Sequence, residues 1–212
     1  MERQRRVADL VERSGFEPFK SGWSIFERSI LVYLAGETDD SWPNTDITDH
    51  TGSALGFVRR TAAPAKRSIY SDFSVYDVRG KEVLKLTAEP RMMRDLRYDI
   101  DGTVRGRYGA LRKTWLTIEA DGSAIGYISS VISYYSAPDL SRGETRVIQS
   151  EHKSTVGVIK SYEVENSMFG HRYDSVMWVD PTADASLRAL LTAAPPIIAS
   201  ARINPAGIMI SP

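Results

Sequence analysis

The 212-residue chain contains no cysteine and only three histidines. The lack of cysteine excludes disulfides, thiolate metal sites, iron–sulfur clusters and a cysteine nucleophile. His50, His152 and His171 are scattered, and none lies in the His-x-His or His-Glu-x-x-His spacings that gather a metal. We therefore expect neither a metal centre nor a cofactor.

Signatures of common catalytic and nucleotide-binding sites are also missing. The chain has no Walker loop, no dinucleotide fingerprint and no Gly-x-Ser-x-Gly elbow. A Ser–His–Asp triad whose members lie far apart in the sequence and meet only in the folded chain remains an alternative. The pairs Asp39/Asp40 and Asp99/Asp101 have the chemistry for acid–base work or calcium binding, but we interpret them as turn residues. We expect the protein not to be an enzyme.

The start of the chain has basic residues but no apolar run behind them, so we expect no secretory signal and a cytoplasmic location. Within residues 3–13, Val7, Leu10 and Val11 recur at helical spacing, and Ser14 and Gly15 follow. This pattern predicts a short amphipathic helix that packs against the rest of the protein.

The net charge is zero, but the charges are unevenly distributed. Residues 57–113 hold 14 Lys and Arg against 7 Asp and Glu, so the remaining residues carry a matching acidic excess. Such asymmetry is compatible with one face that meets an anionic partner, and equally with basic residues on solvated strand faces.

Four turns built on glycine lie between short runs of branched and aromatic residues. They are Asp49–Gly52, Asp77–Gly80, Asp99–Gly102 and Glu119–Gly122. Glycine accepts the positive φ of tight hairpin turns, and an aspartate before it can accept hydrogen bonds from the turn backbone. After three of these turns a similar phrase follows, in which a second glycine (Gly56, Gly106 or Gly126) precedes two strand-forming residues.

The segments between the turns have strand length and β-forming composition. The predicted strands are 27–34, 54–60, 69–76, 82–86, 96–100, 103–108, 114–119, 124–130, 144–150, 154–164 and 171–179. The spacing of the turns is too irregular for a propeller, so successive hairpins of a barrel or sandwich are favoured.

The segment after Pro181 breaks the β pattern. Thr182 or Asp184 can cap a helix, and the residues that follow are leucine and alanine on nearly all sides. Arg188 and the Pro195-Pro196 pair argue against a bilayer span, so we expect burial inside the protein. The prolines are expected to end the helix near Ala193, or to break it before a second turn through 197–201.

The hairpins of the form Asp-x-x-Gly, the Gly-aromatic phrases, the basic strands and the single late apolar helix together resemble the tubby C-terminal-like superfamily. Within that superfamily, this sequence pattern is most similar to the phospholipid scramblase and LURP-one-related branch. The resemblance runs from about Glu27 to Arg202 and is strongest in residues 73–84, 98–106 and 116–128. It implies a closed antiparallel β-barrel of about twelve strands around a central apolar helix. The Pro195-Pro196 pair departs from the family pattern of one continuous helix.

The resemblance and the basic excess together suggest a non-enzymatic protein that binds anionic membrane lipid, of the phosphoinositide type, or a membrane-bound partner. This use would place it at the inner face of the membrane. Clustered Lys and Arg contribute about 1 kcal/mol each to such binding. The candidate anion-binding residues are Arg59, Arg60, Lys66, Arg67, Arg105, Arg107, Arg112 and Lys113.

Two alternatives stay open: a protein-interaction or scaffold module without lipid contact, and a nucleic-acid-binding module. The second would need aromatic stacking platforms beside the arginines, for which Tyr70, Tyr76 and Tyr108 are candidates. The expected organisation is an N-terminal helix and lead-in (1–22), one barrel domain (23–204) with its helix at 183–194 or on to 201, and a tail (205–212). The sequence does not indicate an oligomeric state.

Overall fold

The computed structural model describes residues 1–19, 22, 24–36, 44–61, 72–89, 97–112, 115–131, 142–149, 154–167 and 170–203. The protein is mainly β, with one antiparallel sheet, a helix before it and two short helices after it. The helices are α1 (Glu2–Ser14), α2 (Ala185–Leu191) and α3 (Ala194–Ile203). The strands are β1 (Ile30–Ala35), β2 (Thr45–Thr48), β3 (Ala54–Arg60), β4 (Phe73–Asp77), β5 (Glu82–Ala88), β6 (Arg97–Gly102), β7 (Gly106–Arg112), β8 (Trp115–Ala120), β9 (Ser123–Val131), β10 (Arg142–Gln149), β11 (Thr155–Ser167) and β12 (Gly170–Val179).

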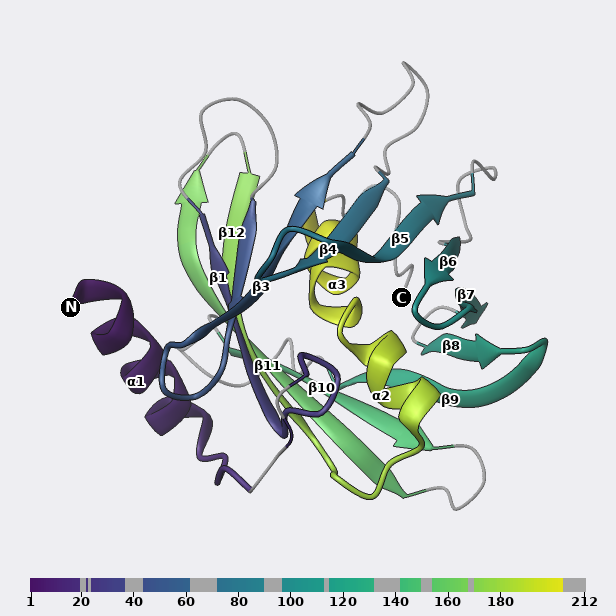
Figure 1. Cartoon of the computed structure of the whole chain (residues 1–212), viewed down its shortest axis with the longest axis horizontal. Coiled ribbons are helices and arrows are strands. Elements are labelled where there is room, and N and C mark those ends of the chain that lie inside the picture. The colour runs from purple at the N-terminus through teal and green to yellow at the C-terminus, as the bar shows by residue number, and fades with distance from the viewer. Residues whose placement is uncertain are drawn as a thin grey trace.

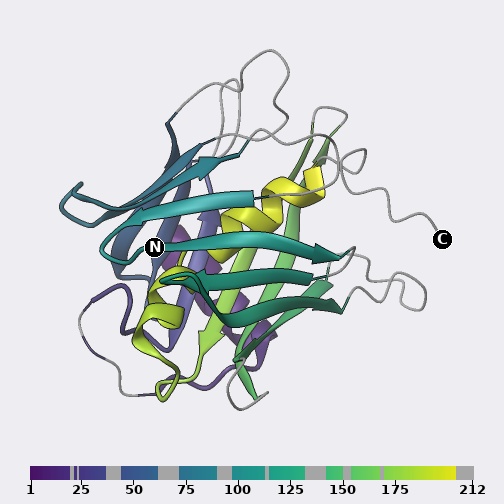
Figure 2. The same ribbon diagram turned by 90° about the vertical axis from the view of Figure 1, so that its right-hand side faces the viewer.

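The sheet follows the order of the chain. Each strand pairs antiparallel with the strand before it and the strand after it, and β1 pairs with both β2 and β12. The strand order therefore returns to its starting strand. Figures 1 and 2 show the sheet curling around α2 and α3, whereas α1 lies outside, beside β1 and β12.

The predicted strands agree with those observed to within a few residues at most ends, and β3 has the predicted bounds. The short strand β2 was not predicted, because its four residues follow a polar segment and carry little apolar signal. The predicted tail, 205–212, lies outside the described residues.

Two of the predicted aspartate turns are confirmed in detail. The Asp49 carboxylate accepts hydrogen bonds from the backbone N–H groups of Thr51 and Ser53, and Asp77 accepts from those of Arg79 and Lys81. The glycine that closes each turn has a positive φ.

The turn predicted at Asp99–Gly102 is wrong. These four residues belong to β6, which runs to Gly102, and the chain reverses over the three residues that follow. Asp99 and Asp101 are strand residues opposite Thr87 and Lys85 of β5. The glycine signal was misleading because Gly102 serves a close backbone approach, where a Cβ atom would clash with the Val83 carbonyl.

The N-terminal helix packs against the outside of the sheet, as predicted. Its Val7 and Leu10 lie in a small apolar cluster with outward-facing residues of β1, β11 and β12. Arg6 makes two hydrogen bonds to the buried carboxylate of Asp174, at 2.8 and 2.7 Å. At the other end of the helix, the Lys160 ammonium donates to the Ser14 carbonyl at 2.7 Å. An ion pair to a buried carboxylate near the start of α1 and a cation at its C-terminus thus hold the helix on the sheet.

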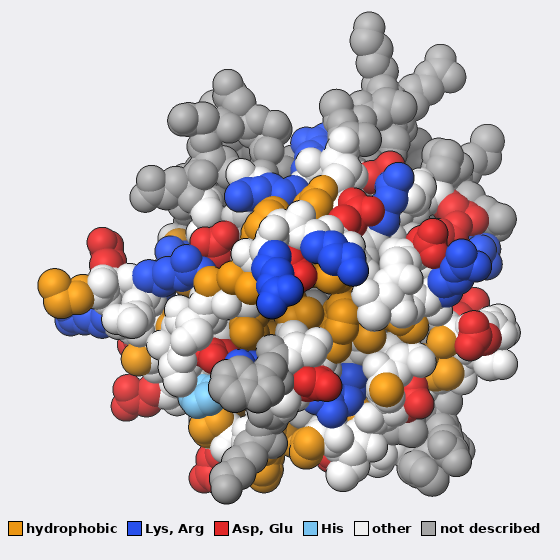
Figure 3. All heavy atoms as spheres, viewed as in Figure 1, with side chains coloured by type: hydrophobic (Ala, Val, Ile, Leu, Met, Phe, Trp, Pro, Cys, Tyr) orange, Lys and Arg blue, Asp and Glu red, His pale blue; other side chains and the backbone are white. Residues whose placement is uncertain are grey.

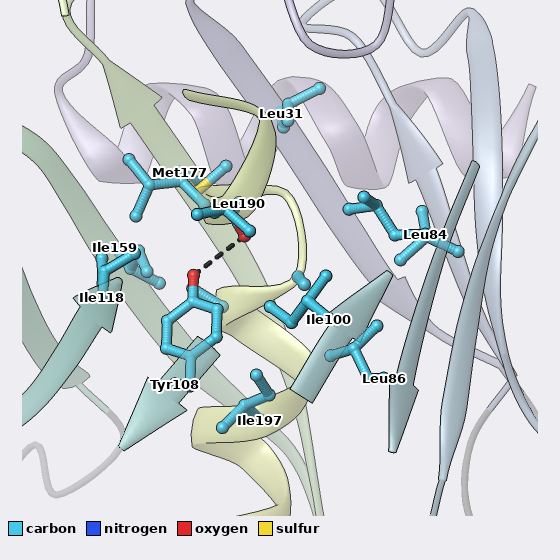
Figure 4. Close-up of a cluster of buried hydrophobic side chains, with 14 of the residues drawn as sticks. Leu31, Leu84, Leu86, Ile100, Tyr108, Ile118, Ile159, Met177, Leu190 and Ile197 are labelled. Carbon is cyan, nitrogen blue, oxygen red and sulfur yellow. Dashed lines mark hydrogen bonds between the residues drawn. The ribbon is translucent and has the colours of Figure 1, made fainter. Parts of the chain in front are cut away.

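The main core lies between the inner face of the sheet and the two C-terminal helices. Every strand whose side chains are described contributes to it, and from the helices Leu187, Leu190, Leu191 and Ile197 are fully buried. Figure 4 shows Leu31, Met177, Ile118 and Ile100 around Leu190 and Ile197. The expected burial of this segment in protein is confirmed, and Asp184 is its N-cap, accepting from the N–H groups of Ser186 and Leu187.

The two helices are separated at Thr192 and Ala193, as the proline pair predicts. A continuous helix would need N–H donors at positions 195 and 196 for the carbonyls of Leu191 and Thr192. Both positions are proline, so these bonds cannot form. In the first turn of α3 the prolines are tolerated, because no intrahelical partner awaits an N–H group there.

Tyrosine hydroxyls from the inner face of the sheet supply donors at this break. Tyr33 of β1 donates to the Thr192 carbonyl at 2.8 Å, and Tyr108 of β7 donates to the Leu190 carbonyl at 2.8 Å (Figure 4). Both tyrosines are buried. Pro196 has no N–H group to donate to the Thr192 carbonyl. The Tyr33 hydroxyl donates to that carbonyl instead.

The helices approach the sheet closely at β7. A Cβ atom on Gly106 would lie 2.6 Å from the backbone carbonyl of Glu119 in β8 and 2.7 Å from Leu190 Cδ1, so this position requires glycine. The second glycine of the repeated phrase is thus explained here by its close contacts with the β8 backbone and with α2 rather than by a turn.

We predict that Tyr33→Phe lowers the free energy of unfolding by about 1–3 kcal/mol, because the Thr192 carbonyl stays buried without its donor. Pro196→Ala provides an N–H group for the same carbonyl, so the double variant is expected to lose less than the two single variants added together. Urea denaturation followed by tryptophan fluorescence measures all four species. Tyr76→Phe, on the outer face, is the control and is expected to change stability by less than about 0.5 kcal/mol. Strict additivity in the cycle would contradict the role of Tyr33.

Alkaline pH is expected to unfold the protein in a tyrosine-linked transition. Burial raises the pKa of Tyr108, and burial together with the charge of Tyr108 raises that of Tyr33. A raised folded-state pKa means that the stabilisation is complete below the unfolded value, near 10, and is lost as the pH rises above it. Each tyrosine contributes a slope of up to about 1.4 kcal/mol per pH unit. Denaturation series above pH 10 should show a shallower fall for Tyr33→Phe than for the parent chain.

Candidate functional site

The predicted basic residues do not form one cluster in the described part of the chain. Arg59 and Arg60 end β3, Arg105 lies between β6 and β7, and Arg107 is in β7. Arg112 is the last residue of β7. Lys66, Arg67 and Lys113 lie outside the described residues.

Neighbouring residues of β3 point to opposite sides of the sheet. Val58 belongs to the inner core, so Arg60 shares the inner side and Arg59 the outer side. Arg60 is opposite the inward-facing Phe73.

Arg105 and Arg107 are each paired with carboxylates. Arg105 Nε donates to Asp101 at 3.0 Å, and Arg107 Nε donates to Asp99 at 2.7 Å, with Glu89 at 3.9 Å. The hydrogen bond and the charge of Asp99 raise the pKa of Arg107 above its ordinary value. These two arginines are thus locally neutralised, which weakens them as anion ligands.

Arg59 is held differently. Its guanidinium lies 4.8 Å from the centroid of the Phe57 ring, and that ring stacks on Tyr76 at 5.0 Å and 18°. Among the described residues no carboxylate forms an ion pair with Arg59. A cation on an aromatic face keeps its hydrogen-bond donors available to a ligand.

Lys85 of β5 joins this group, although the sequence analysis did not select it. Arg59 is opposite Ser74 of β4, and Ser74 is opposite Lys85. The alternation of β5 puts Lys85 on the outer side, away from buried Leu84 and Leu86. The strand pattern was visible in the sequence, but the cross-strand register that joins Lys85 to Arg59 was not. In Figure 3, Lys and Arg side chains lie near the middle of the face viewed, with Asp and Glu side chains among and around them.

The tyrosines proposed as stacking platforms are in different environments. Tyr108 is buried against α2 and cannot stack on a base, so this part of the nucleic-acid interpretation is wrong. Tyr76 is on the outer side and stacks on Phe57. Tyr70 lies outside the described residues.

Asp49 has a structural environment rather than a catalytic one. Burial alone would raise its pKa, but hydrogen bonds from Thr51 and Ser53 and the charge of Arg28 outweigh burial and hold the pKa below its ordinary value. Elsewhere in the described residues, no three histidines or carboxylates gather as a metal site would require. Helices long and apolar enough to cross a membrane are likewise missing from the described parts.

Comparison with known proteins found no match: no family model, no curated protein and no solved structure is similar to this chain.

We predict that Asp49→Asn destabilises the protein by about 1–3 kcal/mol at pH 7, because the charged acceptor of the turn and the partner of Arg28 are lost. The depressed pKa means that the parent's stabilisation is present above the unfolded value, near 3.9, and disappears as the pH falls through the folded value. The stability difference between parent and variant should therefore shrink in acid. Asp121→Asn at an exposed turn is the control, and a difference independent of pH would argue against this role.

Proposed function

We propose that this chain is a non-enzymatic binding protein whose outer basic face contacts anionic membrane lipid or a membrane-bound partner. The observation that carries the proposal is Arg59, a cation held on an aromatic stack with its donors unused by any described carboxylate. Arg and Lys beside partly exposed aromatic rings suit the interface of a membrane, where the rings meet headgroups and the cations meet phosphate.

We also infer a tubby- and scramblase-like architecture, a closed barrel of twelve strands around an apolar C-terminal helix. Support comes from the pairing of β1 with β12 and from the burial of α2 and α3 against the inner face. A sheet of that many strands is too wide to fill with its own side chains, so a helix in its middle supplies the missing core. The break at Pro195-Pro196 is then this chain's own variation on the threaded helix. This function would place the protein in the cytoplasm, at the inner face of the membrane.

A protein-interaction module without lipid contact is the second candidate. The mixed charge around β6 and β7 favours it, because carboxylates already occupy Arg105 and Arg107. A surface of alternating charge is better suited to another folded protein than to a uniformly anionic bilayer.

Co-sedimentation with vesicles tests the proposal. We expect binding to vesicles that contain phosphatidylserine or a phosphoinositide, and none to vesicles of phosphatidylcholine alone. Arg59→Gln should weaken binding roughly fivefold, in line with about 1 kcal/mol per basic residue. Arg79→Gln, at the exposed β4–β5 turn, removes the same charge and is the matched control. Equal binding to neutral vesicles, or equal losses in both variants, would overturn the proposal.

A further inference from the structure

We propose that Arg59, Ser74 and Lys85 form a subsite for one tetrahedral oxyanion of the phosphate type on the outer face of β3, β4 and β5. The inference rests on the proposed function, because it names the chemistry that the basic face would recognise. The source of the phosphate, a lipid headgroup or a free phosphate, is left to the experiment.

The strand register brings the three side chains together. Arg59 is opposite Ser74 across β3 and β4, and Lys85 is opposite Ser74 across β4 and β5. Directly opposed residues of antiparallel strands have Cβ atoms about 5 Å apart. Ser74 alternates with Phe73 and Val75 of the inner core, so its side chain is on the same outer side as the two cations. The register therefore places the hydroxyl between two positive side chains.

The Ser74 hydroxyl is the second observation that points to a ligand. Ser74 is fully buried, and its Oγ has no hydrogen-bond partner. A buried hydroxyl without a partner carries an uncompensated desolvation cost, and such groups in native proteins call for an explanation. An oxyanion between the two cations would accept a hydrogen bond from this hydroxyl. Arg59 and Lys85 are its cross-strand neighbours on the outer side, and their long side chains can change rotamer to admit a ligand.

Two carboxylates near the subsite have hydrogen-bond partners of their own. Asp101, opposite Lys85, is bound by Arg105 at 3.0 Å, and the Asp72 carboxylate accepts from the Ala88 N–H group at 2.9 Å. Arg59 is held over the Phe57 ring rather than by an acid. Two positive charges and one hydroxyl donor thus remain for an anion. Donors from three directions suit the several oxygens of a tetrahedral phosphate better than a planar carboxylate.

The test uses the full chain and inorganic phosphate, with sulfate and acetate for comparison, followed by calorimetry and thermal unfolding. We expect saturable phosphate binding with a dissociation constant of about 1 mM or tighter and a higher melting temperature with phosphate present. Arg59→Gln/Lys85→Gln should abolish this binding. Ser74→Ala should weaken it roughly tenfold, while the variant without phosphate keeps the parent's melting temperature or exceeds it, because an unpaired buried hydroxyl is removed.

Arg79→Gln/Lys81→Gln is the matched control, since it removes two charges from the exposed turn of the same hairpin, where only the backbone N–H groups of these residues bond to Asp77. Equal losses in this control, or an undiminished affinity in Ser74→Ala, would overturn the subsite. Vesicle binding that survives while inorganic phosphate fails to bind would overturn the subsite and leave the proposed function standing. Phosphate binding without vesicle binding would assign the site to a free phosphate or a soluble phosphate ester.

Discussion

The burial of an interrupted helix inside the sheet is the constraint on which the rest of the structure depends. Proline at 195 and 196 removes the N–H donors that the carbonyls of Leu191 and Thr192 would have in a continuous helix. Tyr33 of β1 donates to the Thr192 carbonyl instead, and Tyr108 of β7 donates to the neighbouring carbonyl of Leu190. The sheet is therefore joined to the helices by directional bonds as well as by apolar contact. Such bonds fix the depth and rotation of the helices in a way that leucine packing alone does not.

Much of the fold could be predicted because its signals are local. Alternation of apolar residues predicted the strands. Asp49 and Asp77 indicated turns, because their carboxylates accept hydrogen bonds from backbone N–H groups a few residues later. Asp184 indicated the start of a helix. The prediction failed at Asp99–Gly102, where a similar motif serves an ion pair and a close strand contact instead of a turn. A short motif cannot distinguish these uses, because the decisive partner, Val83 or Arg107, lies elsewhere in the sequence.

The candidate site was less accessible to sequence reasoning, and for the same reason. The count of basic residues in 57–113 was correct, but whether each one can bind an anion depends on the side chains next to it on the neighbouring strands. Arg105 and Arg107 face carboxylates, Arg60 is on the inner side of its strand, and Arg59 rests on an aromatic ring. Lys85 and Ser74 become candidate ligands only because the register of β3, β4 and β5 places them beside Arg59. Register depends on the geometry of the turns and on how the apolar faces of neighbouring strands meet, so no spacing within one strand encodes it.

The order of elements along the chain also bears on how this protein folds during synthesis. The strands that the structure describes all precede α2 and α3, so the apolar inner face of the sheet emerges from the ribosome before the segment that covers it. Until residues 185–203 are made, the strands have nothing to close upon, and their inner residues stay exposed to chaperones and to other chains. A chain truncated before α2 would therefore be an aggregation-prone sheet with an exposed apolar face rather than a smaller stable protein. The last helices therefore complete the core on which the inner face of the sheet packs.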